Sequence, residues 1–424
     1  MVDIMSITYR VLTEDDWDEW VATGALAFLD DVENAAAWAA SVRPLLEWDR
    51  SLGAFDGDRM VGKTHAITFS MSVPGGDLPT AGVTAVSVAS THRRRGILAE
   101  LMRRQLDDTR ARGEPLAALW ASESLIYGRF GYGMAVRSHR VSIDRRHTAF
   151  RPGVPDARGG VRFVEPDARG GVRFVEPDAA LERWPLLYEQ LRGSRPGMIA
   201  RHPDHWRAFI VPRTEKPEGG FTRRQYVEYE APDGPEGYAI YAAKGDSLEG
   251  LPRGTVRLHE LVAANTTAAA ALWRYLFGID LVGTIEASNL PPDDPLLWML
   301  ADPRQLRSIP RDALWVRILD VPRALEGRAY LADGRLILDV RDPFGPWAAG
   351  RFELAVEGGK ASCHPTDASP DVALGADDLA AVYLSGVRPS TLARAGRVEG
   401  SVEALRLADS LFAWHTAPWC LDAF

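Results

Sequence analysis

With 424 residues, 46% of them hydrophobic and 25% charged, the chain has the composition of a globular protein with several domains. Its formal net charge of −9 argues against a nucleic-acid partner, because a nucleic-acid-binding surface is normally basic. Two cysteines, Cys363 and Cys420, provide neither a disulfide framework nor a metal-binding spacing. With no secretory signal and no apolar run of the ~18–20 residues that span a bilayer, we expect a cytoplasmic chain without a membrane or metal partner.

The first part of the chain alternates helix and strand signals. A helix is predicted to begin near Thr13. Strands are predicted over 52–56 and 60–72. The dipeptide Gly57-Asp58 between them is typical of the turn of a tight hairpin.

A third strand, over 83–88, runs through a basic turn into a helix that starts after Gly96. Apolar residues recur with helical spacing in this helix and form one apolar face. A buried strand over 116–120 follows. We interpret residues 1–154 as one α/β domain.

The basic turn, His92-Arg93-Arg94-Arg95-Gly96, carries cations at a place where they are unfavourable. A helix N-terminus bears positive partial charge, and cations there cost ~0.3–1 kcal/mol each. The arginines fit if an anion binds the free amides of the first helical turn. The turn therefore predicts a site for a phosphate-bearing ligand.

Residues 155–165 and 166–176 have the same sequence. Two copies are too few for a solenoid, so we interpret them as a tandem duplication between domains. One copy of Val-Arg-Phe-Val-Glu is expected to start the next domain as a strand and the other to lie in an exposed loop. The linker is placed at 155–171.

A second α/β region is predicted over 172–310. It contains a helix over 179–191 and a strand–turn–helix unit whose turn, 263–267, has neither arginine nor glycine. We interpret the region as a degenerate copy of the first domain that has lost the ligand site. A coincidental α/β similarity remains the alternative.

The last region, 311–424, is predicted to form a third α/β domain. Strands are expected over 314–318, 335–340, 351–356 and 360–364, and helices over 376–385, 390–395 and 402–412. The tail over 414–424 is rich in aromatic residues, whereas an exposed tail is normally polar. We expect it to be buried.

Two segments resemble signatures of the GCN5-related N-acetyltransferase (GNAT) family. Arg93-Arg94-Arg95-Gly96-Ile97-Leu98 resembles its Arg/Gln-x-x-Gly-x-Gly/Ala turn, and Ile126-Tyr127-Gly128-Arg129-Phe130-Gly131-Tyr132-Gly133 resembles its Phe-Tyr-x-x-x-Gly-Phe element. Together with Ala121-Ser122-Glu123 and the layout of the whole chain, they are similar to the Eis (enhanced intracellular survival) acetyltransferases. The resemblance implies two tandem GNAT domains, the second degenerate, followed by a sterol-carrier-protein-like α/β domain over 311–424.

The same resemblance implies an activity and its partners. The co-substrate would be acetyl-CoA, and the acceptor would be a small-molecule amine. One expected class of acceptor is the aminoglycoside antibiotics, which would be acetylated at several positions, an activity that confers antibiotic resistance. The assembly would be a homohexamer. Two alternatives stay open: acetylation of protein lysines or polyamines, and non-catalytic binding of acyl-CoA or lipid.

The resemblance also assigns the site residues. Those expected to bind acetyl-CoA are Val86, Ser87, Val88, Arg94, Arg95, Gly96, Ile97, Leu98, Ala99, Ser122 and Glu123. The strand edge would pair with the pantetheine arm, and the turn would hold the phosphates. Tyr127 would protonate the departing CoA thiolate, and the Phe424 carboxylate, in the third domain, would act as the base.

The sequence departs from the family pattern on the acceptor side. Ala85 stands where a bulky aromatic residue is expected, and Ala423 replaces an acidic residue that could help to hold polycationic substrates. The candidates for an acceptor pocket, each more often a surface or core residue, are Asp30, Asp31, Glu33, Trp38 and Trp48.

Overall fold

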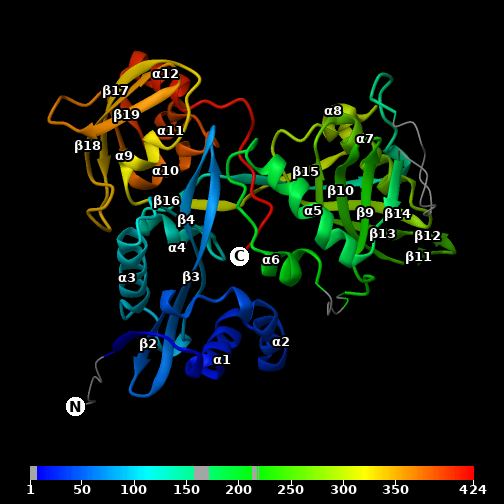
Figure 1. The fold of residues 1–424 in the computed structure, drawn as a ribbon, viewed down its shortest axis with the longest axis horizontal. Helices are drawn as coiled ribbons and strands as arrows, with labels where there is room; N and C mark the ends of the chain where they lie inside the picture. Colours follow the sequence, from blue (N-terminus) through cyan, green and yellow to red (C-terminus); the bar gives the residue numbers. More distant parts are fainter. Residues whose placement is uncertain (1–6, 157–170, 213–216, 218) are drawn as a thin grey trace. The chain divides into compact units, whose positions relative to one another are not determined.

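The computed structural model describes residues 7–156, 171–212, 217 and 219–424, and the chain forms two compact units in it (Figure 1). The first unit contains the residues up to Val136 together with Gly193–Ala200 and Ala313–Phe424. The second contains Arg137–Arg192 and Arg201–Asp312. No helix of these described residues is long and apolar enough to cross a membrane.

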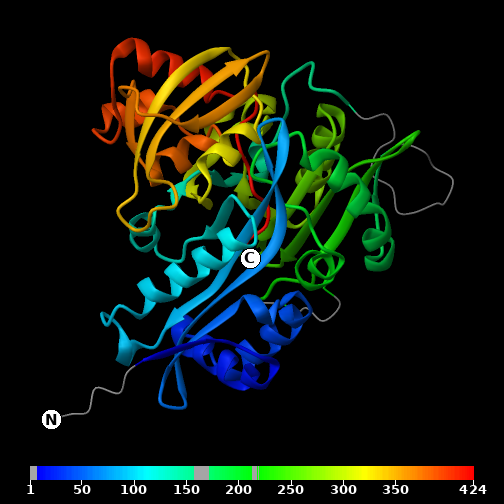
Figure 2. The same ribbon diagram turned by 60° about the vertical axis from the view of Figure 1, so that its left-hand side comes forward.

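The described residues of the first unit form a seven-stranded sheet covered by helices (Figure 2). In spatial order the strands are β1 (Thr8–Val11), β2 (Ser51–Asp56), β3 (Arg59–Val73), β4 (Gly76–Val88), β5 (Leu116–Trp120), β16 (Leu314–Ile318) and β6 (Gly133–Met134). The helices of this part are α1 (Trp17–Phe28), α2 (Val32–Val42), α3 (Ile97–Ala111) and α4 (Ser124–Tyr127). The predicted hairpin, helix after Gly96 and strand over 116–120 are confirmed.

Helix α3 shows why these predictions succeed. Leu101, Met102 and Leu106 are fully buried on one face, whereas Arg103 and Arg104 are exposed on the other. Burying each leucine or methionine side chain contributes ~1.5–3 kcal/mol, so the helical spacing of apolar residues fixes which face meets the sheet.

The sheet of the second unit repeats this arrangement in its described residues. In spatial order its strands are β15 (Arg307–Asp312), β7 (Arg137–Asp144), β14 (Val282–Leu290), β13 (Gly254–Ala263), β10 (Gly234–Lys244), β9 (Gln225–Ala231) and β8 (Gly171–Phe174). A small ribbon, β11 (Ser247–Leu248) and β12 (Leu251–Pro252), and the helices α5 (Pro177–Arg192), α6 (Pro203–His205), α7 (Thr266–Gly278) and α8 (Leu296–Met299) complete it. In each sheet one neighbouring pair is parallel, β4–β5 and β13–β14, and the other pairs are antiparallel. The second region is thus a copy of the first in topology.

Each of the two sheets contains one strand that is far away in the sequence from the strands beside it. β16 lies between β5 and β6, and β7 lies between β14 and β15. The sequence had placed 314–318 with the strands of the third domain and 137–144 inside the first domain. Local periodicity identifies a buried strand but not its partners, and Leu314, Val316 and Ile318 are fully buried in the first sheet.

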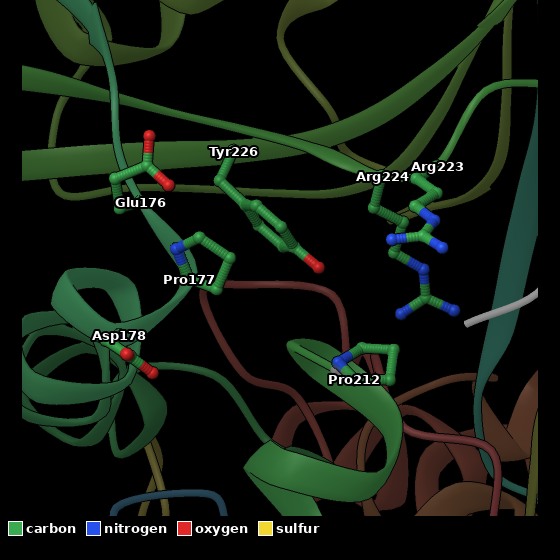
Figure 3. Close-up of a pocket in the computed structure, with 7 residues that line it drawn as sticks. All are labelled: Glu176, Pro177, Asp178, Pro212, Arg223, Arg224 and Tyr226. Carbon is green, nitrogen blue, oxygen red and sulfur yellow. The ribbon is translucent and has the colours of Figure 1, made fainter. Parts of the chain in front are cut away.

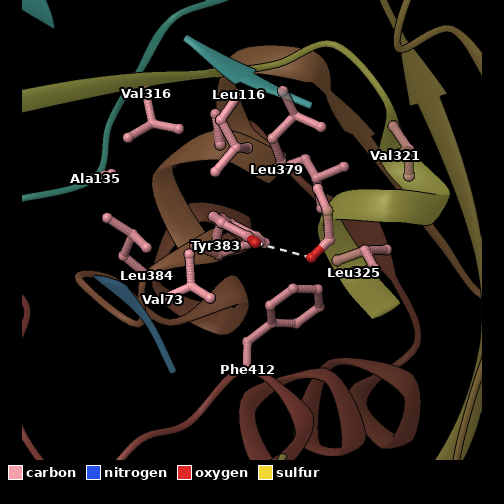
Figure 4. Packing of buried hydrophobic residues seen from close by; sticks show 14 of the residues in the cluster. Val73, Leu116, Ala135, Val316, Val321, Leu325, Leu379, Tyr383, Leu384 and Phe412 are labelled. Carbon is pink, nitrogen blue, oxygen red and sulfur yellow. Dashed lines mark hydrogen bonds between the residues drawn. The ribbon is translucent and has the colours of Figure 1, made fainter. Parts of the chain in front are cut away.

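The C-terminal region has its own sheet and packs on the first one. The strands, in spatial order, are β19 (Lys360–Pro365), β18 (Gly350–Glu357), β17 (Gly334–Arg341), β20 (Val372–Gly375) and β21 (Glu399–Gly400). The helices are α9 (Val321–Glu326), α10 (Ala376–Tyr383), α11 (Pro389–Arg394) and α12 (Val402–Leu411). Figure 4 shows that Leu116 and Val316 of the first sheet share a core with Leu379 and Tyr383 of α10. Both parts therefore belong to one packed body.

The tail over 414–424 is buried in part, at Pro418–Cys420 and Asp422, whereas His415 and Ala423 are exposed. Cys420 and Asp422 are 0% and 3% exposed, and the backbone N–H of Trp419 donates to the carbonyl oxygen of Pro196 at 2.8 Å. The second copy of the duplication begins β8, as predicted for one copy. Residues 157–170, which include most of the first copy, lie outside the described residues.

Candidate functional site

In the first sheet, β4 and β5 stop pairing after Gly82. The pairing of β4 with β5 covers Thr80–Gly82, and within Gly76–Trp120, all of which the structure describes, Val83–Val88 pair with β3 alone. The register of β3 against β4 also shifts here, so that Lys63 opposes Ser87 and His65 opposes Thr84. The resulting β-bulge puts Ala85 at φ 52°, in the left-handed region that costs a non-glycine residue ~1–3 kcal/mol.

Ser87 carries a polar atom for which the described residues offer no partner. Its side chain is 6% exposed, and its Oγ makes no hydrogen bond within the described part of the chain. A buried hydroxyl left in this state costs ~1–3 kcal/mol. Because Val86, Ser87 and Val88 lie on the unpaired edge of β4, their backbone groups fit an extended polar ligand such as the pantetheine arm of acetyl-CoA.

The basic turn follows β4 directly. Nε2 of His92 lies 2.9 Å from Oδ2 of Asp56, which ties the turn to the end of β2. Arg94 and Gly96 both have positive φ, 64° and 80°, and a Cβ added at Gly96 would meet nothing within 4 Å. Arg93–Gly96 are exposed, and α3 starts at Gly96 without a side-chain cap. The uncapped amides of Ile97, Leu98 and Ala99 and the exposed guanidinium groups suit the phosphates of CoA.

The equivalent turn of the second unit is closed by its own side chains. Oδ1 of Asn265 accepts a hydrogen bond from the N–H of Ala268 at 2.9 Å and so caps α7. Nδ2 of Asn265 donates to the Glu236 carboxylate at 2.8 Å, which places a negative charge where an anion would bind. These contacts give a physical reason for the absence of an arginine–glycine turn there.

Tyr127 lies beyond the end of β5, next to the turn that contains Ser122 and Glu123. Its side chain is 5% exposed. Burial raises the pKa of the phenol, the hydrogen bond with the Ser122 side chain lowers it in part, and the negative charge of Glu123 raises it. Tyr127 is therefore protonated at neutral pH and can donate a proton. Phe130 and Tyr132 of the same element are core residues, 3% and 0% exposed.

Phe424 lies against β3 and β4. Its ring meets that of Phe69, and a Cβ on Gly82 would lie 3.1 Å from its Cε2. With Ala85 at the bulge it lines a pocket of about 390 Å³ between the sheet and helices α1 and α2. The lining residues are Trp20, Val21, Gly24, Ala25, Phe28, Asp30, Ala35, Trp38, Ala39, Lys63, Thr84, Ala85 and Phe424.

The structure thus brings the expected residues together in three groups of the first unit. Val86–Val88 and the arginine turn follow one another along the same edge, Tyr127 meets Ser122, and Phe424 lines the same pocket as Ala85. Of the candidates for the acceptor side, Asp30 and Trp38 line the pocket, whereas Asp31, Glu33 and Trp48 are not among its lining residues.

Sequence reasoning missed Lys63. It is 1% exposed, its Nζ lies 3.4 Å from the centroid of the Trp20 ring, and the ammonium donates to the carbonyl oxygen of Trp20. A lone lysine inside the long apolar strand predicted over 60–72 was the signal that could have found it, since lysine is almost never fully buried without a partner.

The second unit holds a separate pocket of about 280 Å³ (Figure 3). Figure 3 shows Tyr226 between an acidic side, Glu176 and Asp178, and a basic side, Arg223 and Arg224, with Pro177 and Pro212 completing the lining. Its residues come from Glu176 and the start of α5, from Pro212, and from the residues just before and within β9, so it is distinct from the turn capped by Asn265.

Comparisons with known proteins agree with this geometry. Residues 8–135 and 197–318 each match an acetyltransferase (GNAT) domain family, and residues 321–421 match the sterol carrier protein domain. The chain is 42% identical to an uncharacterized N-acetyltransferase of Streptomyces avermitilis, over 99% of this chain and all of that protein. It is 36% identical to N-acetyltransferase Eis of Mycobacterium tuberculosis, over 96% and 97% of the two chains.

Solved structures show the same likeness. The structure of Eis1 from Mycobacterium abscessus covers 99% of this chain and 100% of its own, with a TM-score of 0.81 and 32% identity. A GCN5-related N-acetyltransferase from Anabaena variabilis, at 19% identity and a TM-score of 0.82, shares the fold.

Proposed function

Because the chain belongs to the Eis family of GNAT-type N-acetyltransferases and is an acetyltransferase, we propose that it moves the acetyl group of acetyl-CoA directly onto the amine of a small molecule. The observation that carries this proposal is that Phe424 and Ala85 line the same pocket, at the part of β4 that has no partner on the β5 side.

The chain's own residues supply the binding of acetyl-CoA. The backbone groups along the edge of Val86, Ser87 and Val88 would pair with the pantetheine arm. Arg94, Arg95 and the amides from Gly96 to Ala99 would hold the phosphates, while Ser122 and Glu123 would flank the thioester end. Acetyl-CoA supplies an activated acetyl group as its thioester.

The acceptor must lose a proton before it can attack. An alkylamine with a pKa near ~10.4 is almost wholly protonated at neutral pH. The Phe424 carboxylate would attract the ammonium and accept its proton, directly or through a water molecule. The Phe424 ring packs against that of Phe69, and Phe424 lines the pocket, which supports a place for the carboxylate at the acceptor side.

Tyr127 would complete the proton balance. As the new N–C bond forms and the C–S bond breaks, the nitrogen would release its second proton to water, the Tyr127 phenol would donate a proton to the sulfur of CoA, and solvent would restore the phenol. The phenol of Tyr127, whose pKa is raised by burial, carries its proton at neutral pH, so the proton is available for transfer. A positioned proton transfer of this kind contributes ~10²–10⁴-fold.

Three finer expectations belong to the same proposal. Aminoglycosides, protein lysines and polyamines each present primary amines that this chemistry can acetylate. We also propose a homohexamer, as the family resemblance implies, and a cytoplasmic location. Mass spectrometry of the products counts the acetyl groups, and sedimentation velocity measures the assembly.

The test is CoA release. The protein is incubated with acetyl-CoA and a panel of amines, alongside Tyr127→Phe and a chain extended beyond Phe424. Release with at least one amine, reduced in both variants, supports the proposal. Binding of acetyl-CoA without release for any amine overturns it in favour of a non-catalytic binding protein.

A further inference from the structure

Lysine is rare in this chain, and one lysine is buried. Of the 49 lysine and arginine residues, four are lysines: Lys63, Lys216, Lys244 and Lys360. Lys63 is 1% exposed, whereas Lys244 and Lys360 are exposed. Lysine differs from arginine in that burial can remove its proton and leave a nucleophilic amine. The one buried lysine therefore stands apart from the many arginines.

Lys63 also differs from the buried arginines in its partners. Nη2 of Arg50 lies 2.5 Å from Oε2 of Glu114, so that this buried cation meets a carboxylate. Lys63 has no ion pair with any residue that the structure describes, and its ammonium meets the carbonyl oxygen and the ring of Trp20. Burial lowers the pKa of Lys63 to about 7. At pH 7 about half of the Lys63 amines are therefore neutral and nucleophilic.

Lys63 lines the pocket that Ala85 and Phe424 also line. On β3 it opposes Ser87 of β4, so it lies one strand in from the edge that would pair with the pantetheine arm. A Cβ added at Gly24 of α1 would lie 2.9 Å from its Nζ, so the glycine leaves room for the amine between helix and sheet. The lysine amine and the acceptor side of the site thus share one space of about 390 Å³.

Two residues with carboxylates, Asp30 and Phe424, line the pocket together with Lys63. The neighbouring strands β2 and β4 present a glycine and a serine opposite Lys63, neither of them ionisable. His65 follows two residues along β3. Burial, together with the positive charges of Arg50 and Lys63, lowers the pKa of His65 to about 3, so its ring is neutral at pH 7. The pocket therefore offers proton acceptors to an attacking amine.

We propose that Lys63 is a modification site, acetylated at Nζ by the acetyl-CoA that the same chain binds. The neutral amine attacks the carbonyl carbon of the thioester, and the N–C bond forms as the C–S bond breaks. The nitrogen releases one proton to a pocket carboxylate or to water, Tyr127 donates one to the sulfur of CoA, and solvent restores the phenol. The products are an acetylated lysine and CoA with a thiol. This inference rests on the proposed acetyl transfer and adds an acceptor that the chain itself carries.

Incubation of the protein with isotopically labelled acetyl-CoA, without any added amine, tests the proposal. Peptide mass spectrometry before and after the incubation locates every acetyl group, including any acquired during expression. We expect at most one acetyl group at Lys63 per chain, and roughly tenfold or more faster labelling there than at Lys244 or Lys360. No acetyl group at Lys63 in either sample, or labelling no faster than at the exposed lysines, overturns the inference.

Three variants separate transfer within the site from spontaneous acylation. Tyr127→Phe should slow the labelling of Lys63 by about 10²-fold or more, because the proton donor is lost. Lys63→Met should abolish the release of CoA in the absence of amine, and Lys360→Met should leave it unchanged. Labelling of Lys63 at the full rate in Tyr127→Phe overturns the inference.

The pH dependence gives a second readout on the wild-type protein. With a pKa of about 7, the labelling rate at Lys63 should rise about tenfold from pH 6 to pH 8 and then level off. Spontaneous acylation of a short lysine peptide, whose amine has a pKa of ~10.4, should rise about tenfold per pH unit throughout. The same steady rise at Lys63 overturns the inference in favour of spontaneous acylation.

The two proposals fail in different ways. Acetylation of a small-molecule amine with no acetyl group on Lys63 keeps the proposed function and overturns the inference. Acetylated Lys63 without acetylation of any amine in the panel keeps the inference and overturns the activity on small molecules.

Discussion

The ring of Phe424 packs edge-on against the ring of Phe69, with 5.0 Å between the centroids and 65° between the planes. Phe69 belongs to β3, so the end of the tail is held by the strand that pairs with the bulged part of β4. Such an aromatic pair adds ~0.5–1.5 kcal/mol beyond the area that it buries. Together with the buried Trp419 and Cys420, it gives the final residues a defined place instead of a frayed end.

Extending the chain by two glycines after Phe424 should lower kcat by about 10²-fold or more, because the carboxylate leaves the pocket. Steady-state CoA release measures the effect. The same two glycines added at the N-terminus serve as the control and should leave kcat unchanged. Full activity of the C-terminal extension would remove the carboxylate from the mechanism.

Tyr127→Phe should lower kcat by ~10²–10⁴-fold with little change in KM for acetyl-CoA, because only the proton donor is lost. The pKa of Tyr127 is raised above its usual value of 10.0, mainly by burial. The phenol therefore keeps its proton up to pH 10, and the wild-type kcat should show no decline from its ionisation below that pH. A variant as active as the wild type contradicts the assignment.

Arg94→Gln and Arg95→Gln should each weaken the binding of CoA by roughly tenfold or more, since a hydrogen bond to a charged group contributes ~1.5–3 kcal/mol. Isothermal titration calorimetry measures the Kd. Arg104→Gln is the matched control: it removes a guanidinium from α3 that pairs with Glu100 at 2.7 Å rather than facing the turn. Equal losses in all three variants would indicate a general charge effect.

Lys63→Met should stabilise the protein, and the gain should depend on pH. Burial lowers the pKa of Lys63 from 10.5 to about 7 in the folded state. Between these values the unfolded chain holds the proton more tightly, so the stability of the wild type rises with pH from about 7 to 10.5. The gain in the variant should therefore be largest at or below pH 7 and shrink towards pH 10.

Urea unfolding of Lys63→Met and the wild type at pH 6.5 and pH 9.5 measures this difference in the free energy of unfolding. Lys360→Met should show no such trend, because Lys360 is exposed. A gain that grows with pH would contradict the lowered pKa.

Gly133→Ala should destabilise the first unit. A Cβ at this position of β6 would collide with the backbone carbonyl oxygen of Asp377 and the backbone nitrogen of Ala381, both in α10. Overpacking of this kind costs ~1–3 kcal/mol. Gly193→Ala, where a Cβ meets nothing within 4 Å, is the control. Thermal unfolding should give a lower Tm for the first variant alone.

The sequence predicted what depends on neighbouring residues along the chain. The helix after Gly96, the strand over 116–120 and the hairpin at Gly57-Asp58 follow from local periodicity and turn chemistry. The position of Leu314–Ile318 in the first sheet does not follow from local periodicity. A strand that is buried on both faces has the same sequence pattern in whichever sheet it pairs.

The acceptor side of the site also shows that local sequence patterns do not predict contacts between distant elements. Asp30 and Trp38 were candidates from their residue types, but Lys63, Trp20 and Phe28 reach the pocket from two elements whose contact no local pattern encodes. The positive φ of Ala85 is equally invisible in the sequence, since it arises from a register shift between two strands.

β7 pairs in the second sheet and β16 pairs in the first. The order in which these strands are synthesised therefore limits when each sheet can be completed. β16, which lies between β5 and β6 in the sheet, is synthesised later than both of them. The ribosome must translate the whole second unit before it reaches β16. Until Leu314–Ile318 emerge, the nascent sheet exposes two unpaired edges, which are templates for aggregation. A chaperone that shields these edges during translation would raise the yield of folded protein, whereas a fragment ending before Leu314 keeps them permanently open.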